Sequence, residues 1–296
     1  MKRFVILLSA LLIVTSVCFA QENIGARPIA LGGAFAGLAD DANAIFLNPA
    51  GIGYVRGEVA SFSSKLSNDN EYTILGGVQQ TAYGSFGVGY ISSSSQITDL
   101  TDSAALADEG DVAVRSLSQT LVLSFARELN DFMVVPESMG RMSVGTNVKF
   151  ASSRVANAKG LTSDQNSGLT IDLAAVLKPG DKFAFGFGMR NLMAGDTASE
   201  GSGFGLFAGV SSKLLNDAVV ISLENGGAGC ELWLIPELAL RVGRDGEYNT
   251  AGIGINLQGF GIDYGYLGKE TPVHYVGVSL AIDSAEDLRQ ANLISE

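Results

Sequence analysis

Apolar and polar side chains alternate along most of the chain. In 183–190, large apolar residues occupy the odd positions, while Ala, Gly, Gly and Arg occupy the even ones. The same period of two runs through 142–150, 260–266 and 274–282. Because successive side chains of a strand point to opposite faces of a sheet, this pattern predicts β-strands with one apolar face.

Repetition of this pattern predicts an all-β chain of about fourteen strands. The segments lie at approximately 57–66, 71–79, 82–92, 117–127, 139–152, 166–177, 182–190, 204–213, 217–224, 229–235, 237–243, 250–257, 259–267 and 273–282. The 229–243 pair is the weakest, and without it the count falls to about twelve. Either even count closes an antiparallel barrel with both termini at the same end.

The residues on the other face of these strands, opposite the large apolar side chains, indicate which face contacts water and which contacts lipid. They are mainly Gly, Ala, Ser and Asn, whereas a soluble barrel is covered with Lys, Glu and Thr. Large apolar residues facing lipid and small polar residues facing a lumen are typical of a transmembrane barrel. An exported soluble β-sandwich is the alternative. The charged residues expected to face the lumen are Lys149, Asp172, Arg190, Arg241 and Asp263.

The amino-acid composition supports the prediction of a transmembrane barrel and argues against several activities. Hydrophobic residues make up 47% and charged residues 17%. No apolar stretch after residue 20 reaches the length of a membrane helix, so a barrel is the remaining way to span a membrane. The net charge of −12 disfavours nucleic-acid binding. The chain has a single histidine, His274, so it cannot form a metal site with several imidazole ligands, and any Ser-His mechanism would depend on this one residue. We therefore expect no catalytic residues, metal or cofactor.

The two ends carry their own signals. A basic start at Lys2 and Arg3, an apolar run over 4–14 and small residues up to Ala20 predict a signal peptide over 1–20. Its removal would leave Cys230 as the only cysteine, without a disulfide partner. The chain ends in a polar tail, 283–296. An exported barrel is expected in the outer membrane of a Gram-negative-type bacterium, in contact with its lipid.

Residues 24–53 do not alternate. Asp40 and Asp41 precede the apolar stretch 42–47, which suggests a short helix with carboxylates at the positive end of its dipole. The Asn-Pro pair that follows would end this helix, because a residue before proline avoids the helical region. On the residues alone, this would be a short capped helix that covers the periplasmic mouth of a barrel over 57–282.

The amino-acid sequence of this segment resembles that of a known protein family. GARPIALGGAFAGLADDANAIFLNPAGIG, residues 25–53, is similar to the N-terminal signature of the FadL-type barrel superfamily and especially its PorV/PorQ branch. Stretches 231–233, 238–243, 259–264 and 273–280 resemble the same branch. The resemblance implies a fourteen-stranded outer-membrane barrel whose N-terminal segment, residues 21–56, folds inward as a luminal hatch. Its hatch motif corresponds to Arg27, Asp40, Asp41, Asn48, Pro49 and Gly51.

The resemblance implies two non-enzymatic roles. The PorV branch implies an accessory of type IX-like protein secretion or envelope assembly, with secretion-system or other envelope proteins as partners. The FadL branch implies the alternative, a channel for long-chain fatty acids or other hydrophobic small molecules. A structural barrel without transport is a third reading. Fold alone does not choose among them.

Three remaining features have simpler interpretations. Glycine pairs such as Gly252 and Gly254 repeat every second residue within strands, so they do not form a dinucleotide-binding turn. The acidic residues within 93–116 are expected to form a solvated loop surface. The position of His274 in its strand places it on the lipid-facing side.

Overall fold

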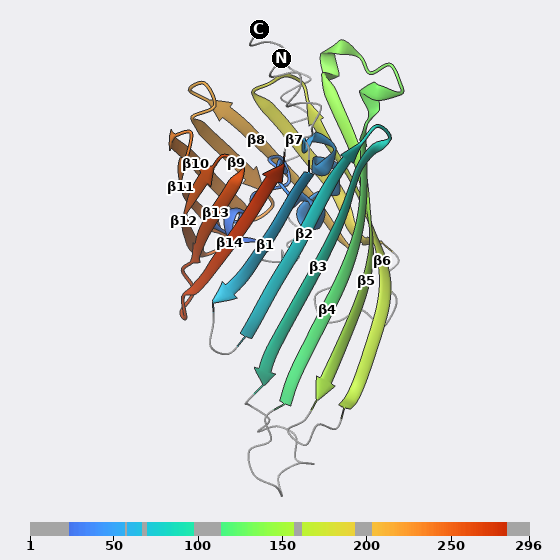
Figure 1. Cartoon of the computed structure of the whole chain (residues 1–296), viewed down its shortest axis with the longest axis vertical. Coiled ribbons are helices and arrows are strands. Elements are labelled where there is room, and N and C mark those ends of the chain that lie inside the picture. The colour runs from blue at the N-terminus through green and yellow to red at the C-terminus, as the bar shows by residue number, and fades with distance from the viewer. Residues whose placement is uncertain are drawn as a thin grey trace, which may run out of the picture.

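A computed structural model describes residues 24–56, 58–66, 70–97, 114–156, 162–192 and 203–282. They form one closed antiparallel barrel of fourteen strands, in which each strand pairs with its sequence neighbours and β1 pairs with β14 (Figure 1). The predicted barrel is therefore confirmed, and the weak 229–243 pair forms two strands, β10 and β11. The predicted signal peptide and polar tail lie outside the described residues.

The strands are β1 (Glu58–Leu66), β2 (Asn70–Thr81), β3 (Gly84–Ile97), β4 (Val114–Glu128), β5 (Arg141–Ala156), β6 (Thr162–Lys178), β7 (Phe183–Leu192), β8 (Gly205–Leu214), β9 (Val219–Glu224), β10 (Gly227–Ile235), β11 (Leu238–Asp245), β12 (Tyr248–Leu257), β13 (Phe260–Leu267) and β14 (Val273–Ile282). The start of β1 and the end of β14 lie side by side. We call this end of the barrel the periplasmic end, because outer-membrane barrels keep both termini and their short turns there.

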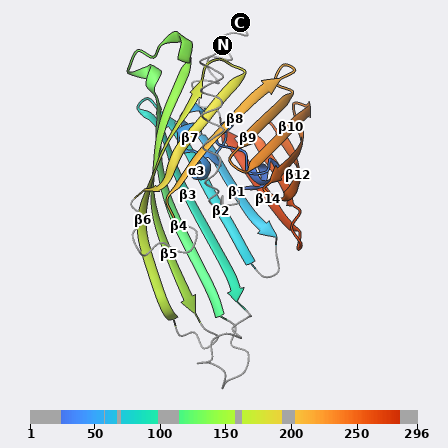
Figure 2. The same cartoon turned by 180° about the vertical axis from the view of Figure 1, so that it is seen from behind.

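The barrel wall is taller on one side than on the other. Strands β4, β5 and β6 have 15, 16 and 17 residues, whereas β9 has 6 and β11 and β13 have 8 (Figures 1 and 2). The sequence pattern ends β3 near residue 92, yet the ladder continues through Ser92–Ser95, which pair with Ser116–Gln119. Polar side chains interrupt the apolar alternation there, but the backbone groups still need partners, and a neighbouring strand supplies them.

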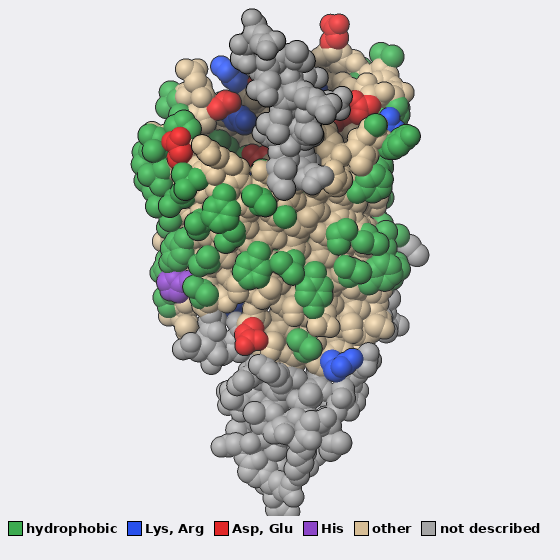
Figure 3. Space-filling model, viewed as in Figure 1, with side chains coloured by type: hydrophobic (Ala, Val, Ile, Leu, Met, Phe, Trp, Pro, Cys, Tyr) green, Lys and Arg blue, Asp and Glu red, His purple; other side chains and the backbone are tan. Residues whose placement is uncertain are grey.

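Large apolar side chains cover the outside of the barrel. Alternate positions expose them on the outer surface (Figure 3), and the burial pattern shows that the small or polar residues between them point inward. The exposed set includes Phe62, Leu75, Phe86, Val88, Leu121, Leu123, Phe150, Leu173, Phe187, Leu206, Ile221, Leu240, Ile253, Ile262 and Leu280. Such a surface suits hydrocarbon rather than water.

Exchanging one outward side chain for a charge tests this orientation. Leu123→Arg would place a guanidinium on the lipid-facing wall and should cost about 2–4 kcal/mol of unfolding free energy. Ser118→Arg, on the inward face of the same strand, should cost much less. Urea unfolding in phospholipid vesicles measures both values. Equal costs for the two variants would mean that the faces are assigned wrongly.

The core of the molecule lies inside the barrel and is built from residues 24–56, which we call the N-terminal segment. It contains α2 (Ala26–Ala30), α3 (Ala44–Leu47) and the 3-10 helix η2 (Pro49–Tyr54). Its side chains pack against inward residues of β2 and β4, namely Ile74, Val78, Val122 and Ala126. None of the helices in the described ranges is long and apolar enough to cross a membrane.

The helix expected over 42–47 is shorter than predicted. It occupies Ala44–Leu47 and ends at Asn48, whose extended backbone precedes Pro49 as expected. The carboxylates do not occupy its first turn: the side chain of Asp41 accepts the N–H of Asn43 and otherwise points to Arg27. The prediction of carboxylates capping this helix is therefore wrong, since a buried guanidinium is a stronger partner than a one-turn helix. Helix α2, with Pro28 inside it, was not predicted.

Candidate functional site

The candidate site is the contact between the N-terminal segment and the inner wall of the barrel. Wall glycines let the two backbones approach closely. A Cβ on Gly186 of β7 would overlap the Ala36 carbonyl oxygen, and a Cβ on Gly265 of β13 would overlap the carbonyl oxygen of Ala26. The small residues on the inward face therefore form a surface against which this segment packs, rather than the lining of an empty lumen.

Polar wall side chains supply hydrogen bonds that the irregular backbone of the segment needs. Arg190 donates to the carbonyl of Leu47 at 2.7 Å, and one Glu224 oxygen accepts the N–H groups of Phe35 and Ala36 at 2.8 and 2.7 Å. Four further residues make similar bonds from other strands: Ser63 to Ala26, Asn147 to Ile45, Ser211 to Gly37 and Thr250 to Ala30. Since unpaired buried backbone groups are costly, these bonds fix the segment in place.

Arg27 connects the start of the segment with its middle and with the barrel wall. One nitrogen donates to Asp40 at 2.7 Å and to Asp41 at 2.8 Å, and two others donate to Glu231 of β10, both at 3.0 Å. Burial alone would lower the pKa of Arg27, but the nearby carboxylates of Asp40, Glu231 and Asp41 raise that pKa well above its ordinary value. The carboxylates therefore favour the charged form of the Arg27 guanidinium at this site.

Glu231 lies between two guanidinium groups. It is 1% exposed and accepts from Arg27 and, at 2.6 Å, from Arg241 of β11, which is itself buried. Arg241 also donates to Asp263 of β13 at 2.6 Å. This network joins the segment to β10, β11 and β13, and its two most buried charges, Glu231 and Arg241, depend on their ionic partners for compensation.

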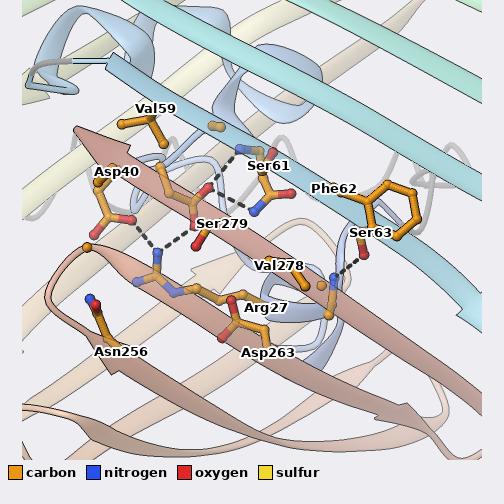
Figure 4. Close-up of a pocket in the computed structure, with 17 residues that line it drawn as sticks. Arg27, Asp40, Val59, Ser61, Phe62, Ser63, Asn256, Asp263, Val278 and Ser279 are labelled. Atoms are coloured by element: carbon orange, nitrogen blue, oxygen red, sulfur yellow. Dashed lines mark hydrogen bonds and ion pairs between the residues drawn. The ribbon is translucent and has the colours of Figure 1, made fainter.

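A cavity of about 240 Å³ lies beside this network at the periplasmic end. Figure 4 shows Arg27 and Asp40 on one side of it and Ser61, Ser63 and Ser279 of the wall on another. Val59, Phe62 and Val278 add apolar lining. The cavity is thus a gap with mixed polar and apolar lining between the segment and strands β1, β13 and β14.

The remaining charged residues predicted in the lumen lie on the opposite sector of the wall. Lys149 of β5 is 2.8 Å from a carboxylate oxygen of Asp172 of β6, which is 1% exposed. Asp172 also accepts the backbone N–H of Asn191, and Arg190 lies 3.8 Å from Glu224. The five predicted residues therefore fall into separate groups rather than one site.

Asn48 joins two parts of the segment. It is fully buried, donates to the carbonyl of Ala36 at 2.7 Å and accepts the N–H of Ala50 at 3.2 Å. Pro49 begins η2, and a Cβ on Gly51 would overlap the carbonyl of Ala39. The Asn-Pro-Ala-Gly run thus forms a tight internal corner.

Removing the Asn48 amide should loosen this corner. Asn48→Ala leaves a buried carbonyl and N–H unpaired, at a cost of about 1–3 kcal/mol. Limited proteolysis of the folded barrel should then cut within 24–56 faster than in the parent protein. Asn249→Ala, at an exposed position, serves as the matched control. Unchanged cleavage of the Asn48→Ala protein would contradict the role assigned to Asn48.

The sequence interpretation missed Glu224 and Glu231. Glu231 lies two residues after Gly229 and therefore on the same inward face of β10. A charged residue among the small residues of this face could have indicated a buried ion pair. Glu224 ends its strand, where parity is harder to assign. His274 lies on the outward face, with its Nδ1 2.6 Å from the Tyr264 hydroxyl. Cys230 is a free cysteine.

No group of metal-ligating residues was found among the described residues. The acidic residues Asp99, Asp102, Asp108, Glu109 and Asp111 fall outside those residues.

Comparison with known proteins defines the fold further. No protein-family model and no curated protein matches the sequence. Among solved structures, a deletion mutant of the TodX monoaromatic hydrocarbon channel aligns over 86% of this chain and 97% of its own, with a TM-score of 0.60 and 13% identity. A Pseudomonas aeruginosa FadL homologue aligns over 89% and 99%, with a TM-score of 0.55 and 12% identity. The chain thus has the fold of outer-membrane β-barrels of the FadL and TodX type, in agreement with the predicted barrel.

Proposed function

We propose that this chain is an outer-membrane channel for hydrophobic solutes, in which residues 21–56 act as a movable hatch. One observation carries the proposal: the N-terminal segment meets different sectors of the wall through different kinds of contact. The similarity in fold to a hydrocarbon channel supports the same reading.

The contact with β2–β4 is apolar. Ile45 and Phe46 lie against Gly76 and Gly89, and the same sector carries Ile74, Val78 and Val122. Moving the segment away from these strands would expose an apolar inner wall. An apolar solute could replace the lost contacts there, whereas a charged solute would lose its hydration without compensation.

The contact with β10 and β11 is charged. Separating Arg27 from Glu231 would leave ions buried without partners, at a cost of several kcal/mol. Opening on the β2–β4 side breaks apolar contacts and leaves this network intact. The charged side therefore serves as the hinge and the apolar side as the gate.

Uptake into cells tests the channel proposal. A Gram-negative strain lacking its own fatty-acid channel would express the chain, and uptake of a radiolabelled long-chain fatty acid would be compared with that of a monosaccharide. We expect fatty-acid uptake above the empty-vector level and no gain for the sugar. A folded barrel in the outer membrane that gives no gain for the fatty acid would contradict the proposal.

A second candidate is an accessory of protein secretion or envelope assembly. The resemblance of residues 25–53 to the PorV/PorQ signature favours it. This role requires protein partners at the loops or the periplasmic rim. Affinity purification of the detergent-extracted protein, followed by mass spectrometry, separates the two roles. Stoichiometric envelope proteins without bound lipid would favour the accessory, and a fatty-acid-like ligand on a solitary barrel would favour the channel.

A further inference from the structure

The connection between β4 and β5 differs from the other turns at the periplasmic end. It contains two short 3-10 helices, η3 (Leu129–Asp131) and η4 (Glu137–Met139), whereas only a few residues join β2 to β3 or β12 to β13. Between the two helices the chain exposes apolar side chains: Phe132 is 52%, Met133 51% and Val134 98% exposed. A water-facing turn would not normally present three such residues in a row.

The base of this connection is well ordered by hydrogen bonds. The side chain of Asn130 donates to the carbonyl of Gly140 at 3.0 Å and accepts the N–H of Met142 at 3.0 Å. Arg141 makes two hydrogen bonds to Glu128 across the same junction. The apolar tip is therefore held at a defined place rather than on a loose loop.

That place lies on the outer side of the wall. Arg127 lies four residues after the lipid-facing Leu123 in β4, so it is on the same outward face. Its guanidinium lies 4.8 Å from the centre of the Phe132 ring. Figures 1 and 2 both show the connection extending beyond the periplasmic end of the neighbouring strands. The Arg127 Nε is buried and has no hydrogen-bond partner among the described residues. A cation stacked on an aromatic ring at this level is typical of a side chain at the membrane interface.

The apolar tip continues the lipid-facing surface. Below it on β3 and β4, the rings of Phe86 and Phe125 are 5.0 Å apart, and Tyr83 in the adjacent turn is 77% exposed. Continuity with a surface that already meets lipid identifies the occupant as lipid rather than a second protein.

We propose that residues 129–140 form a membrane-interface anchor whose tip, Phe132 to Val134, inserts into the periplasmic leaflet. Arg127 then lies at the level of the phospholipid headgroups, where aromatic and cationic side chains gather. The anchor fixes the height and tilt of the tall wall in the bilayer. This inference does not depend on whether the lumen carries solutes.

Fluorescence quenching by brominated phospholipids tests the anchor. The chain contains one tryptophan, so Trp233→Phe provides a silent background into which single tryptophans are placed. Val134→Trp reports on the tip, Leu123→Trp on the lipid-facing wall and Asp181→Trp on the exposed β6–β7 turn at the same end. Each full-length protein is reconstituted in vesicles of phospholipid brominated on its acyl chains, and gel mobility without heating verifies folding.

We expect quenching of Val134→Trp to approach that of Leu123→Trp and to exceed that of Asp181→Trp severalfold. Quenching no stronger than that of Asp181→Trp would overturn the anchor, because the tip would then lie in water or against a periplasmic protein. Val134 is almost fully exposed, so its replacement leaves the fold intact and the result interpretable.

Discussion

Glu231→Gln is expected to release the N-terminal segment from the wall. Glu231 compensates both Arg27 and Arg241, and a neutral amide would leave these guanidiniums short of countercharge in a buried site. Loss of one partner from a buried ionic network costs about 3–5 kcal/mol. Because the barrel strands keep their backbone ladder, the loss should appear as displacement of the segment rather than unfolding of the barrel.

Protease accessibility measures this displacement. In a folded, heat-modifiable barrel, Glu231→Gln should be cut within 24–56 under conditions that leave the parent intact. Asp217→Asn is the matched control, since its pair with Lys213 is exposed and contributes about 0–1 kcal/mol. Equal resistance of the Glu231→Gln protein and its parent would show that the network does not hold the segment.

Gly186→Val should have a comparable effect through sterics alone. Any Cβ at this position overlaps the Ala36 carbonyl oxygen, and neither atom can rotate away because the backbone fixes the position of both. The segment must shift or the β7 backbone must distort, and overpacking of this kind costs about 1–3 kcal/mol or more.

A nearby glycine separates this clash from a general loss of strand quality. Gly205, in the neighbouring β8, would meet nothing within 4 Å if it gained a Cβ. Gly205→Val should therefore leave protease resistance unchanged, whereas Gly186→Val should expose residues 24–56 to cleavage. Similar cleavage of the two variants would remove the case for close backbone contact at Gly186.

The barrel could be predicted from the sequence because each strand can be recognised from the order of its own residues. Side chains alternate every second residue in segments such as 183–190, and this period alone separates the lipid face from the lumen face. Boundaries were less accurate where polar runs such as Ser92–Ser95 continue a strand, since the backbone ladder there does not depend on apolar side chains.

The site was less predictable because its contacts join residues far apart in the chain. Arg27 and Glu231 are 204 residues apart, and no local pattern pairs them. The aspartates at 40 and 41 suggested a helix cap by their local setting, but the buried guanidinium decides their orientation. The resemblance of residues 25–53 to a family signature indicated an inward-folding segment, but not which wall residues would hold it.

The central claim is that solutes pass when the segment moves away from the β2–β4 wall. A disulfide between Gly53→Cys and Ala126→Cys would prevent this movement, since the new Cβ at 53 would lie 3.6 Å from that of residue 126, within the range for a disulfide. Cys230→Ala removes the competing thiol, and Ser143→Ala removes a hydroxyl that the new side chain would touch.

A second pair, Ala26→Cys with Gly277→Cys, provides the matched control. The Cβ atoms there would be 3.4 Å apart, and the bond would tie the segment to β14 near the charged hinge, where we expect no movement. This control separates a specific block of the gate from any effect of crosslinking the segment.

The most direct measurement is fatty-acid uptake by cells carrying either oxidised pair. The account predicts that the Gly53→Cys/Ala126→Cys bond abolishes uptake until a reductant restores it, while the Ala26→Cys/Gly277→Cys bond leaves uptake near the parent level. Undiminished uptake with the first bond fully formed would contradict a gate on the β2–β4 side.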